Sequence, residues 1–319
     1  MPTKKLETLF VVIPCYNEEA VLEETTKRIK LKLEELIKSK KISVDSRVMY
    51  VNDGSKDSTW SIIKEINKKE KLFTGITLSR NRGHQNALLA GLMTAKKYAD
   101  LVISMDADLQ DDINAIDQMI EEYNKGNEIV YGVRSARKKD TFFKKFTAEG
   151  FYKIMKFMGV DIVFNHADYR LTSKKVLDEL EKYNEVNLFL RGIFPLIGYK
   201  TSIVYYERSE RFAGESKYPL KKMLSFAWEG ITSFTTTPLK MIMNFGLIIA
   251  FLSMIYLIYV LIRYLTGNTV TGWATITTLI CLFSGIQIFC IGVIGEYLGK
   301  VYIETKARPR YCIEEELEH

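Results

Sequence analysis

The chain has 319 residues and a mass of 36.8 kDa, which suits one large domain with an appendage or two modest domains. A formal net charge of +6 and a hydrophobic fraction of 47% exclude a chain that is disordered throughout. The four cysteines form no CxxC pair, so neither a disulfide framework nor a structural zinc site is expected.

Apolar runs alternate with amphipathic or N-capped segments through the first 133 residues. Short apolar runs indicate buried strands, and apolar residues spaced three and four apart indicate helices. Strands are expected at residues 9–14, 47–52, 74–78, 101–105 and 129–133, and helices at 18–38, from 57 onward, 85–98 and 113–124. This alternation predicts an α/β fold with a Rossmann-like, mostly parallel sheet covered by helices on both faces.

Polar segments follow the first four expected strands, and in such a sheet a ligand binds beyond the carboxyl ends of the strands. These segments are Pro-Cys-Tyr-Asn-Glu-Glu at 14–19, Asn-Asp-Gly-Ser at 52–55, Ser-Arg-Asn-Arg-Gly-His at 79–84 and Asp-Ala-Asp-Leu-Gln-Asp-Asp at 106–112. The sequence has no GxGxxG loop after the first strand and no Walker A loop. A dinucleotide-binding domain and a P-loop NTPase are therefore disfavoured.

Asp106 and Asp108 stand at the end of the fourth expected strand. Alternate side chains of an extended segment point the same way, so both carboxylates can face one cation, with Gln110 adding a neutral oxygen. Mg²⁺ or Mn²⁺ held in this way keeps coordination positions open for a diphosphate and stabilises the charge of a leaving nucleotide. The alternative is a solvated acidic turn at a helix start, which Asp111 and Asp112 would also suit.

Two long uncharged segments, 241–262 and 274–295, follow the α/β region. A helix of either length spans about 33 Å, enough for a bilayer core, so we expect a two-helix transmembrane hairpin rather than buried helices of a soluble protein. Basic residues flank the pair at 240 and 300–310, which by the positive-inside rule places the catalytic domain and both termini in the cytoplasm. Glycines at 285, 292, 295 and 299 form a seam that predicts close packing on another helix.

Residues 134–156 hold eight basic and two acidic residues, a net charge of +6, interleaved with aromatic side chains. This pattern predicts contact with an anionic membrane surface, with a solvated helix face as the alternative; no nucleic-acid motif accompanies it. Arg208, Arg211 and Lys217 precede an expected interfacial helix and suit a phosphate, so a lipid phosphate fits this layout. The expected organisation is a catalytic domain at 1–218, the interfacial helix at 219–238, two spans within 239–299, a cytoplasmic tail at 300–316 and a tag remnant at 317–319.

Several motifs in order resemble the donor site of family 2 glycosyltransferases with the GT-A fold. They are Val-Ile-Pro-Cys-Tyr-Asn-Glu-Glu at 12–19, Val-Asn-Asp-Gly-Ser at 51–55 and Asp-Ala-Asp-Leu-Gln-Asp at 106–111. The segments His-Ala-Asp-Tyr-Arg-Leu at 166–171 and Arg-Phe-Ala-Gly-Glu-Ser-Lys-Tyr at 211–218 are similar to its polyprenyl-phosphate subgroup. That subgroup includes bactoprenol glucosyltransferases and, more distantly, dolichyl-phosphate mannose synthases. The resemblance runs from about residue 9 to 310, and Asp112 departs from the proline that relatives commonly carry.

The resemblance implies roles for individual residues of this chain. Nucleotide-sugar binding is assigned to Pro14, Tyr16, Asn17, Glu18, Asp53 and Asp106, and metal ligation to Asp108 and Gln110. Acceptor-phosphate binding is assigned to Arg134, Arg170, Arg208, Arg211, Ser216 and Lys217, and catalysis to Asp106, Asp108, Asp168 and Lys217. Asp168 is expected to reach the donor sugar or the acceptor phosphate, with an ordinary loop carboxylate paired to Arg170 as the alternative. His84 is expected to lie near a helix start rather than to act as a base.

The expected function is transfer of a hexose from a nucleotide sugar, UDP-glucose first, to undecaprenyl phosphate, with inversion and with Mg²⁺ or Mn²⁺. UDP-N-acetylglucosamine or GDP-mannose as donor is the alternative within the class. A processive synthase is disfavoured because a QxxRW motif and further spans are missing. An inactive nucleotide-sugar sensor or a scaffold is the alternative from another class, and the intact Asp106–Gln110 set argues against it. Expected partners are a second copy of the chain, up to a tetramer, a lipid-sugar flippase and a downstream glycosyltransferase, with no nucleic acid.

Overall fold

The computed structural model describes residues 6–135, 166–186, 188–207, 232, 235–266 and 272–317. The chain divides into two compact units. The first comprises Met1–Tyr152, Asp161–Tyr218 and Ala307–His319, and the second comprises Lys153–Val160 and Pro219–Lys306. The division differs from the expected bounds of 1–218 at two places, because Lys153–Val160 groups with the second unit and Ala307–His319 with the first.

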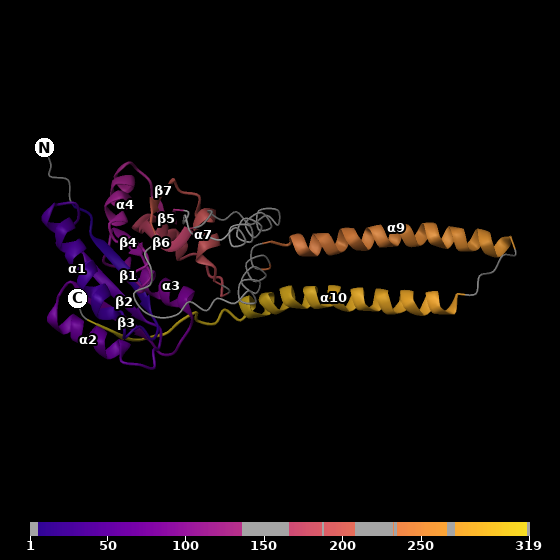
Figure 1. The fold of residues 1–319 in the computed structure, drawn as a ribbon, viewed down its shortest axis with the longest axis horizontal. Helices are drawn as coiled ribbons and strands as arrows, with labels where there is room; N and C mark the ends of the chain where they lie inside the picture. Colours follow the sequence, from indigo (N-terminus) through magenta and orange to yellow (C-terminus); the bar gives the residue numbers. More distant parts are fainter. Residues whose placement is uncertain are drawn as a thin grey trace. The chain divides into compact units, whose positions relative to one another are not determined.

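The first unit is built on one eight-stranded sheet in the order β7-β5-β6-β4-β1-β2-β3-β8 (Figure 1). The strands are β1 (Leu9–Cys15), β2 (Arg47–Asn52), β3 (Phe73–Leu78), β4 (Leu101–Ser104), β5 (Ile129–Arg134), β6 (His166–Ser173), β7 (Thr201–Tyr206) and β8 (Ile313–Glu316). Neighbouring strands pair in parallel, except that β6 runs antiparallel to β4 and β5, and β8 runs antiparallel to β3. The prediction of a mostly parallel α/β sheet is confirmed.

The four helices that the sequence predicts in this unit are α1 (Leu22–Lys38), α2 (Thr59–Lys69), α3 (His84–Ala95) and α4 (Ala115–Asn124). Two further helices, α6 (Lys174–Leu180) and α7 (Leu190–Ile197), were not predicted. Helix α1 begins at Leu22 instead of residue 18, and in the loop before it the backbone N–H of Glu18 donates to Thr59 Oγ1. The strands and helices expected within residues 9–133 all form, with shifts of a few residues at their ends.

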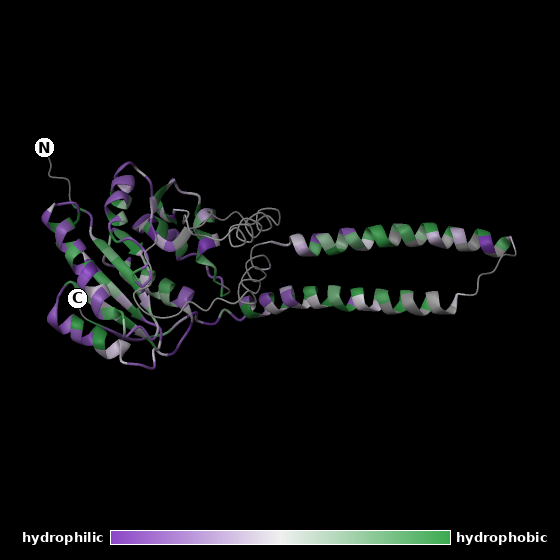
Figure 2. Ribbon diagram, viewed as in Figure 1, coloured by the Kyte–Doolittle hydropathy of each residue, from purple (hydrophilic) through white to green (hydrophobic). Residues whose placement is uncertain are grey.

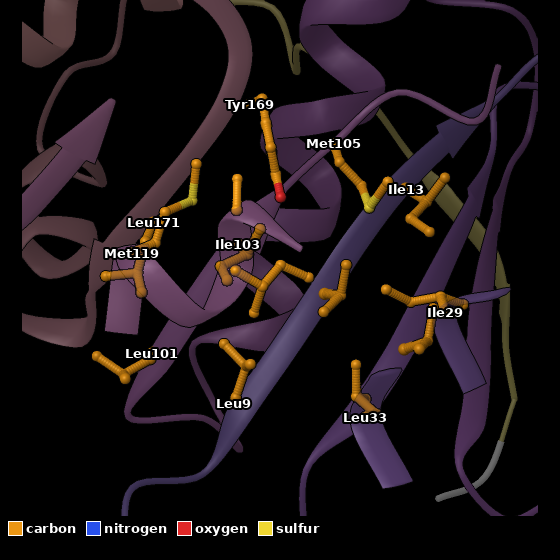
Figure 3. Close-up of a cluster of buried hydrophobic side chains, with 14 of the residues drawn as sticks. Leu9, Ile13, Ile29, Leu33, Leu101, Ile103, Met105, Met119, Tyr169 and Leu171 are labelled. Carbon is orange, nitrogen blue, oxygen red and sulfur yellow. The ribbon is translucent and has the colours of Figure 1, made fainter. Parts of the chain in front are cut away.

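Both faces of the central strand β1 are buried, which is why it reads as an uninterrupted apolar run. Leu9 and Ile13 belong to the same core cluster as Ile29 and Leu33 of α1 (Figure 3). On the opposite face, α3 lies so close that a Cβ on Gly91 would stand 2.4 Å from Val12 Cγ1. These contacts fix β1 between two helical layers and leave its carboxyl end at the rim.

Strand β8 is an element that sequence reasoning missed. It covers the edge of β3, and beyond it the Leu317 N–H donates to Gly75 O at 2.8 Å, so the first residue of the expected tag remnant extends the sheet contact. Glu315 accepts from the Trp60 indole at 3.2 Å and pairs with Lys64 at 2.7 Å. The tail thus protects a sheet edge that would otherwise present unpaired backbone groups.

Deleting residues 311–319 from the full chain is expected to destabilise the catalytic unit. The deletion removes several backbone hydrogen bonds and the Glu315 contacts, and such bonds contribute about 1 kcal/mol each, so a loss of about 2–4 kcal/mol follows. Urea unfolding followed by circular dichroism measures it. Deleting residues 318 and 319 alone is the matched control; equal stability of the two deletions would show that β8 contributes nothing.

The second unit contains α9 (Thr237–Leu265) and α10 (Trp273–Thr305), which contact each other. Each has a segment long and apolar enough to cross a membrane, Thr237–Tyr256 and Leu282–Thr305 (Figure 2). Almost none of the side chains in these segments are buried, which argues against core helices of a soluble protein. A Cβ added at Gly285, Gly292, Gly295 or Gly299 would meet no described atom within 4 Å, so α9 does not pack on the glycine seam.

Candidate active site

The loops after β1 and β2 are tied together at the rim of the sheet. Asn17 has a positive φ of 55°, its N–H donates to Ser55 Oγ at 3.0 Å, and its Oδ1 accepts from the Lys56 N–H at 2.9 Å. Tyr16 is exposed beside it and Glu18 is half-buried, whereas Pro14 is buried within β1. Tyr16 and Glu18 can therefore face a ligand, while the amide oxygen of Asn17 shapes the loop.

Asp53 holds the loop that follows β3. Its two carboxylate oxygens accept from the N–H groups of Arg82 at 2.7 Å and Gly83 at 2.9 Å, and the residue is 2% exposed. Burial raises the pKa of Asp53 although both hydrogen bonds oppose the rise. Next to it Gly54 has a φ of 61°, and a Cβ there would lie 2.6 Å from the Arg80 carbonyl carbon, so the two loops need glycine to approach.

The metal assignment places Asp106, Asp108 and Gln110 on one turn after β4. Asp106 and Asp108 are partly exposed, Gln110 is 6% exposed, and the Gln110 N–H donates to Asp108 Oδ1 at 3.1 Å. Burial raises the pKa of Asp106 to about 6; His84 opposes this, and the charges of Asp111, Asp168 and Asp108 add to it. Crowded carboxylates with an amide oxygen fit Mg²⁺ or Mn²⁺, because a hard cation relieves their repulsion.

Asp168 sits at the centre of a group of donors, of which sequence reasoning named only Arg170, as the partner in its alternative interpretation of Asp168. Arg170 Nη2 donates to Asp168 Oδ1 at 2.5 Å, and Arg191 Nη2 donates to Oδ2 at 3.1 Å. Gln85 Nε2 is 3.3 Å and His84 Nε2 is 3.4 Å from Oδ2. Burial alone would raise the pKa of Asp168, but Arg191, His84 and Arg170 hold it well below its usual range. A carboxylate kept ionised in this way is a poor base and a strong anchor for its cationic neighbours.

His84 links the two acidic groups of the site. It is the first residue of α3, as expected, and its Nε2 lies 3.8 Å from Asp106 Oδ1 and 3.4 Å from Asp168 Oδ2. Burial lowers the pKa of His84, but the hydrogen bond with Asp168 and the charges of both aspartates outweigh it and raise the pKa overall. Asp106 and Asp168, 62 residues apart in the sequence, thus belong to one site.

The residues assigned to the acceptor divide into three groups. Arg134 ends β5 and its side chain is 24% exposed, so it can meet a ligand. Arg170 is completely buried against Asp168 and Phe194, so it supports Asp168 and has no surface for a phosphate in this arrangement. The other four, Arg208, Arg211, Ser216 and Lys217, lie outside the described residues, as do His166's side chain, most of the basic segment and most of the expected interfacial helix.

The mostly parallel sheet, with acidic side chains at the carboxyl ends of β2 and β4, has the GT-A fold of a glycosyltransferase. Residues 10–181 match the profile of Glycosyl transferase family 2, and residues 237–301 match the GtrB C-terminal hairpin. The chain belongs to glycosyl transferase family 2, and it is a glycosyltransferase.

Curated relatives cover nearly the whole chain. The uncharacterized glycosyltransferase YkoT of Bacillus subtilis is 50% identical over 309 residues, 97% of this chain and 92% of that protein. The prophage bactoprenol glucosyl transferase homolog of Escherichia coli K12 is 40% identical over 305 residues, 95% of this chain and 97% of that protein. The bactoprenol glucosyl transferase of Shigella phage SfX is 39% identical over 305 residues, with the same two coverages.

Proposed function

We propose that the protein transfers a hexose, glucose in the first instance, from a UDP-sugar to a polyprenyl phosphate such as undecaprenyl phosphate. The observation that carries the proposal is one chain with both parts of this reaction: a GT-A rim with Asp106 and Asp108, and two apolar helices that can hold it at a bilayer. Relatives named bactoprenol glucosyl transferase extend along both parts and support the same acceptor.

The proposed chemistry is a single displacement with inversion. An anionic oxygen of the lipid phosphate attacks the anomeric carbon, a new carbon–oxygen bond forms, and the bond to the nucleoside diphosphate breaks with its electron pair on the diphosphate. The attacking oxygen carries no proton to remove, so the reaction needs no strong base, which agrees with the depressed pKa of Asp168. A divalent cation held by Asp108 and Gln110 would supply charge stabilisation for the leaving diphosphate.

Around the reacting groups, the chain's own side chains have distinct tasks. Tyr16, Glu18 and the loop held by Asp53 are placed to bind the nucleoside, although Asp53 already accepts two backbone hydrogen bonds. Asp168 holds Arg191 and also contacts His84, which in turn lies beside Asp106. Preorganised cations at this point are suited to stabilise negative charge that develops on the diphosphate.

The experiment that tests the proposal is a donor panel. The full chain in liposomes with undecaprenyl phosphate is incubated with radiolabelled UDP-glucose, UDP-N-acetylglucosamine and GDP-mannose, with Mg²⁺, with Mn²⁺ and with chelator. We expect metal-dependent label in the lipid fraction with UDP-glucose. Label from another donor alone would change the sugar assignment, and no label from any donor, with nucleotide still bound, would favour the sensor or scaffold function.

We further propose that the catalytic unit and both chain ends lie in the cytoplasm and that copies of the chain associate. The basic flanks at 240 and 300–310 support the orientation, and the uncovered glycine seam supports a homo-oligomer, with a tetramer as one form. A flippase for the lipid-linked sugar and a downstream glycosyltransferase would complete the sequence of reactions. Cysteine labelling from each side of sealed vesicles checks the orientation.

Lys217→Ala is expected to weaken use of the lipid phosphate while UDP binding stays the same. Loss of a charged hydrogen bond costs about 1.5–3 kcal/mol, roughly one to two decades in kcat/KM for the acceptor. Steady-state kinetics in liposomes, with Lys200→Ala at the exposed start of β7 as the control, measure it. An unchanged acceptor kcat/KM would remove Lys217 from the phosphate site.

A further inference from the structure

Three side chains form a hydrogen-bonded group at the loop that follows β4, with two of them buried and the third partly exposed. The Tyr206 hydroxyl donates to Asp111 Oδ1 at 2.5 Å, Arg134 Nη2 donates to the same oxygen at 3.2 Å, and Arg134 Nε donates to the Tyr206 oxygen at 3.2 Å. The Asp111 side chain is fully buried. We call these three residues the Asp111 triad.

The triad joins the two strands from which the assigned acceptor segments leave. Strands β5 and β7 pair in parallel with Arg134 opposite Tyr206, and Ser135 donates to Tyr206 O through its N–H at 2.9 Å. The basic segment continues from Arg134, and the loop with Arg208, Arg211 and Lys217 begins just after Tyr206. Both segments therefore start from one point of the sheet.

The same point is connected to the assigned metal ligands. Asp111 follows Gln110 directly, and the next residue, Asp112, accepts through its carbonyl oxygen from the Tyr169 hydroxyl at 3.0 Å. Tyr169 in turn packs edge-on against Tyr206, with ring centroids 5.3 Å apart. The metal loop is thus held by side chains of β5, β6 and β7 at once.

The hydrogen bonds of the triad do not by themselves require a negative charge on Asp111. Its Oδ2 is buried and has no hydrogen-bond partner among the described residues, and a neutral amide could accept from Tyr206 and Arg134 equally well. A buried charge that is only half satisfied is costly unless its field serves a purpose. Arg134 pairs with Asp111, and its side chain is 24% exposed at the end of β5.

We infer that Asp111 is a positioning residue for the acceptor: with Tyr206 it holds the Arg134 guanidinium where the acceptor phosphate arrives, at a set distance from the metal loop. The inference rests on the proposed function for the identity of that acceptor. The inference gives Asp111 control over the affinity for the acceptor. Asp111 belongs to neither the nucleotide-sugar set nor the metal set. An arginine whose fork is fixed in advance loses less conformational freedom when it binds a phosphate.

The test compares Asp111→Asn, Tyr206→Phe and Arg134→Gln in the full chain in liposomes. We expect Asp111→Asn to raise the KM for undecaprenyl phosphate about tenfold, while the KM for UDP-glucose and calorimetric UDP–Mn²⁺ binding stay within about twofold. Tyr206→Phe should shift the acceptor KM in the same direction by less. The matched control is Asp112→Asn, which makes the same charge change at the next residue. Among the described contacts, the Asp112 carboxylate bonds only Asn114.

A double variant separates positioning from general weakening of the loop. If Asp111 acts through Arg134, adding Asp111→Asn to Arg134→Gln changes the acceptor KM by less than about threefold, because the guanidinium that Asp111 positions is already gone. An unchanged acceptor KM in Asp111→Asn, an equal rise in donor KM, or additive effects in the double variant would each overturn the inference. Thermal melting shows whether each variant is folded. If Asp111→Asn is not folded, the acceptor KM of Tyr206→Phe still tests the inference.

A binding measurement without donor separates this inference from the proposed function. Flotation with vesicles that contain or lack undecaprenyl phosphate reports acceptor binding directly. If the wild type binds the phosphate lipid in an Asp111-dependent way but transfers no sugar, the proposed function fails and the inference stands. If it transfers sugar but Asp111→Asn binds the lipid normally, the inference fails and the function stands. If it neither transfers sugar nor distinguishes the vesicles, both fail.

Discussion

Asp108→Ala is expected to lower metal-dependent sugar transfer by about 10²–10³-fold and to leave the fold intact. The loss is large because Asp108 is one of two carboxylates on the turn after β4, and removing it takes a charged ligand from a site that must stabilise a departing diphosphate. We expect the fold to survive because the Asp108 side chain is partly exposed and lies in a turn outside the strands and helices.

Two measurements check this result. Calorimetry of UDP binding with and without Mn²⁺ should show that the variant loses the metal-dependent part of the affinity, and circular dichroism should show an unchanged melting midpoint. Asp45→Ala, at an exposed carboxylate before β2, is the control for charge loss. Near wild-type transfer by Asp108→Ala with Mg²⁺ or Mn²⁺ would mean that the metal, if used, binds elsewhere.

Asp168→Ala is expected to destabilise the catalytic unit by about 3–5 kcal/mol, because it leaves the buried guanidinium of Arg170 without its carboxylate. Arg191 loses the same partner, so transfer should fall as well. Chemical denaturation of the wild type, Asp168→Ala and Asp168→Asn measures the change. Asp178→Ala is the control, because it breaks an ion pair with Lys96 at a carboxylate that is 53% exposed. It should lower the free energy of unfolding by less than about 1 kcal/mol.

The pH dependence follows from the direction of the Asp168 shift. Its folded pKa lies well below the usual value, so the unfolded state takes up the proton first as pH falls. The stabilisation is therefore fully present above the unfolded pKa of about 3.9 and is lost as pH falls toward the folded pKa. The stability difference between wild type and Asp168→Asn should be constant between about pH 5 and 6 and shrink below about pH 4. A difference that stayed the same below pH 4 would contradict the depressed pKa of Asp168.

The uncharged segments and the acidic turn could be recognised from the sequence because each is a local property. Asp106, Asp108 and Gln110 lie within five residues of one another after a strand, so the sequence alone keeps them close together. The structure places them on a turn after β4 and not on an extended segment, so the alternation expected of a strand does not apply to them. The two membrane-length helices depend only on the absence of charge over a helix of sufficient length. No knowledge of a distant partner is needed for either inference.

The sequence by itself determined the parallel core, because strands buried on both faces must be apolar throughout, as β1 is. Only the tertiary structure decided β6. Its residues Asp168, Arg170 and Thr172 are polar although buried, so the segment lacks the apolar run that indicates a central strand. It likewise decided β8, which pairs with β3 across more than 230 residues, and the meeting of Asp111 with Arg134 and Tyr206. Such contacts join residues far apart in the chain, and hydrophobic periodicity carries no information about which distant segment will satisfy a buried polar group or an open sheet edge.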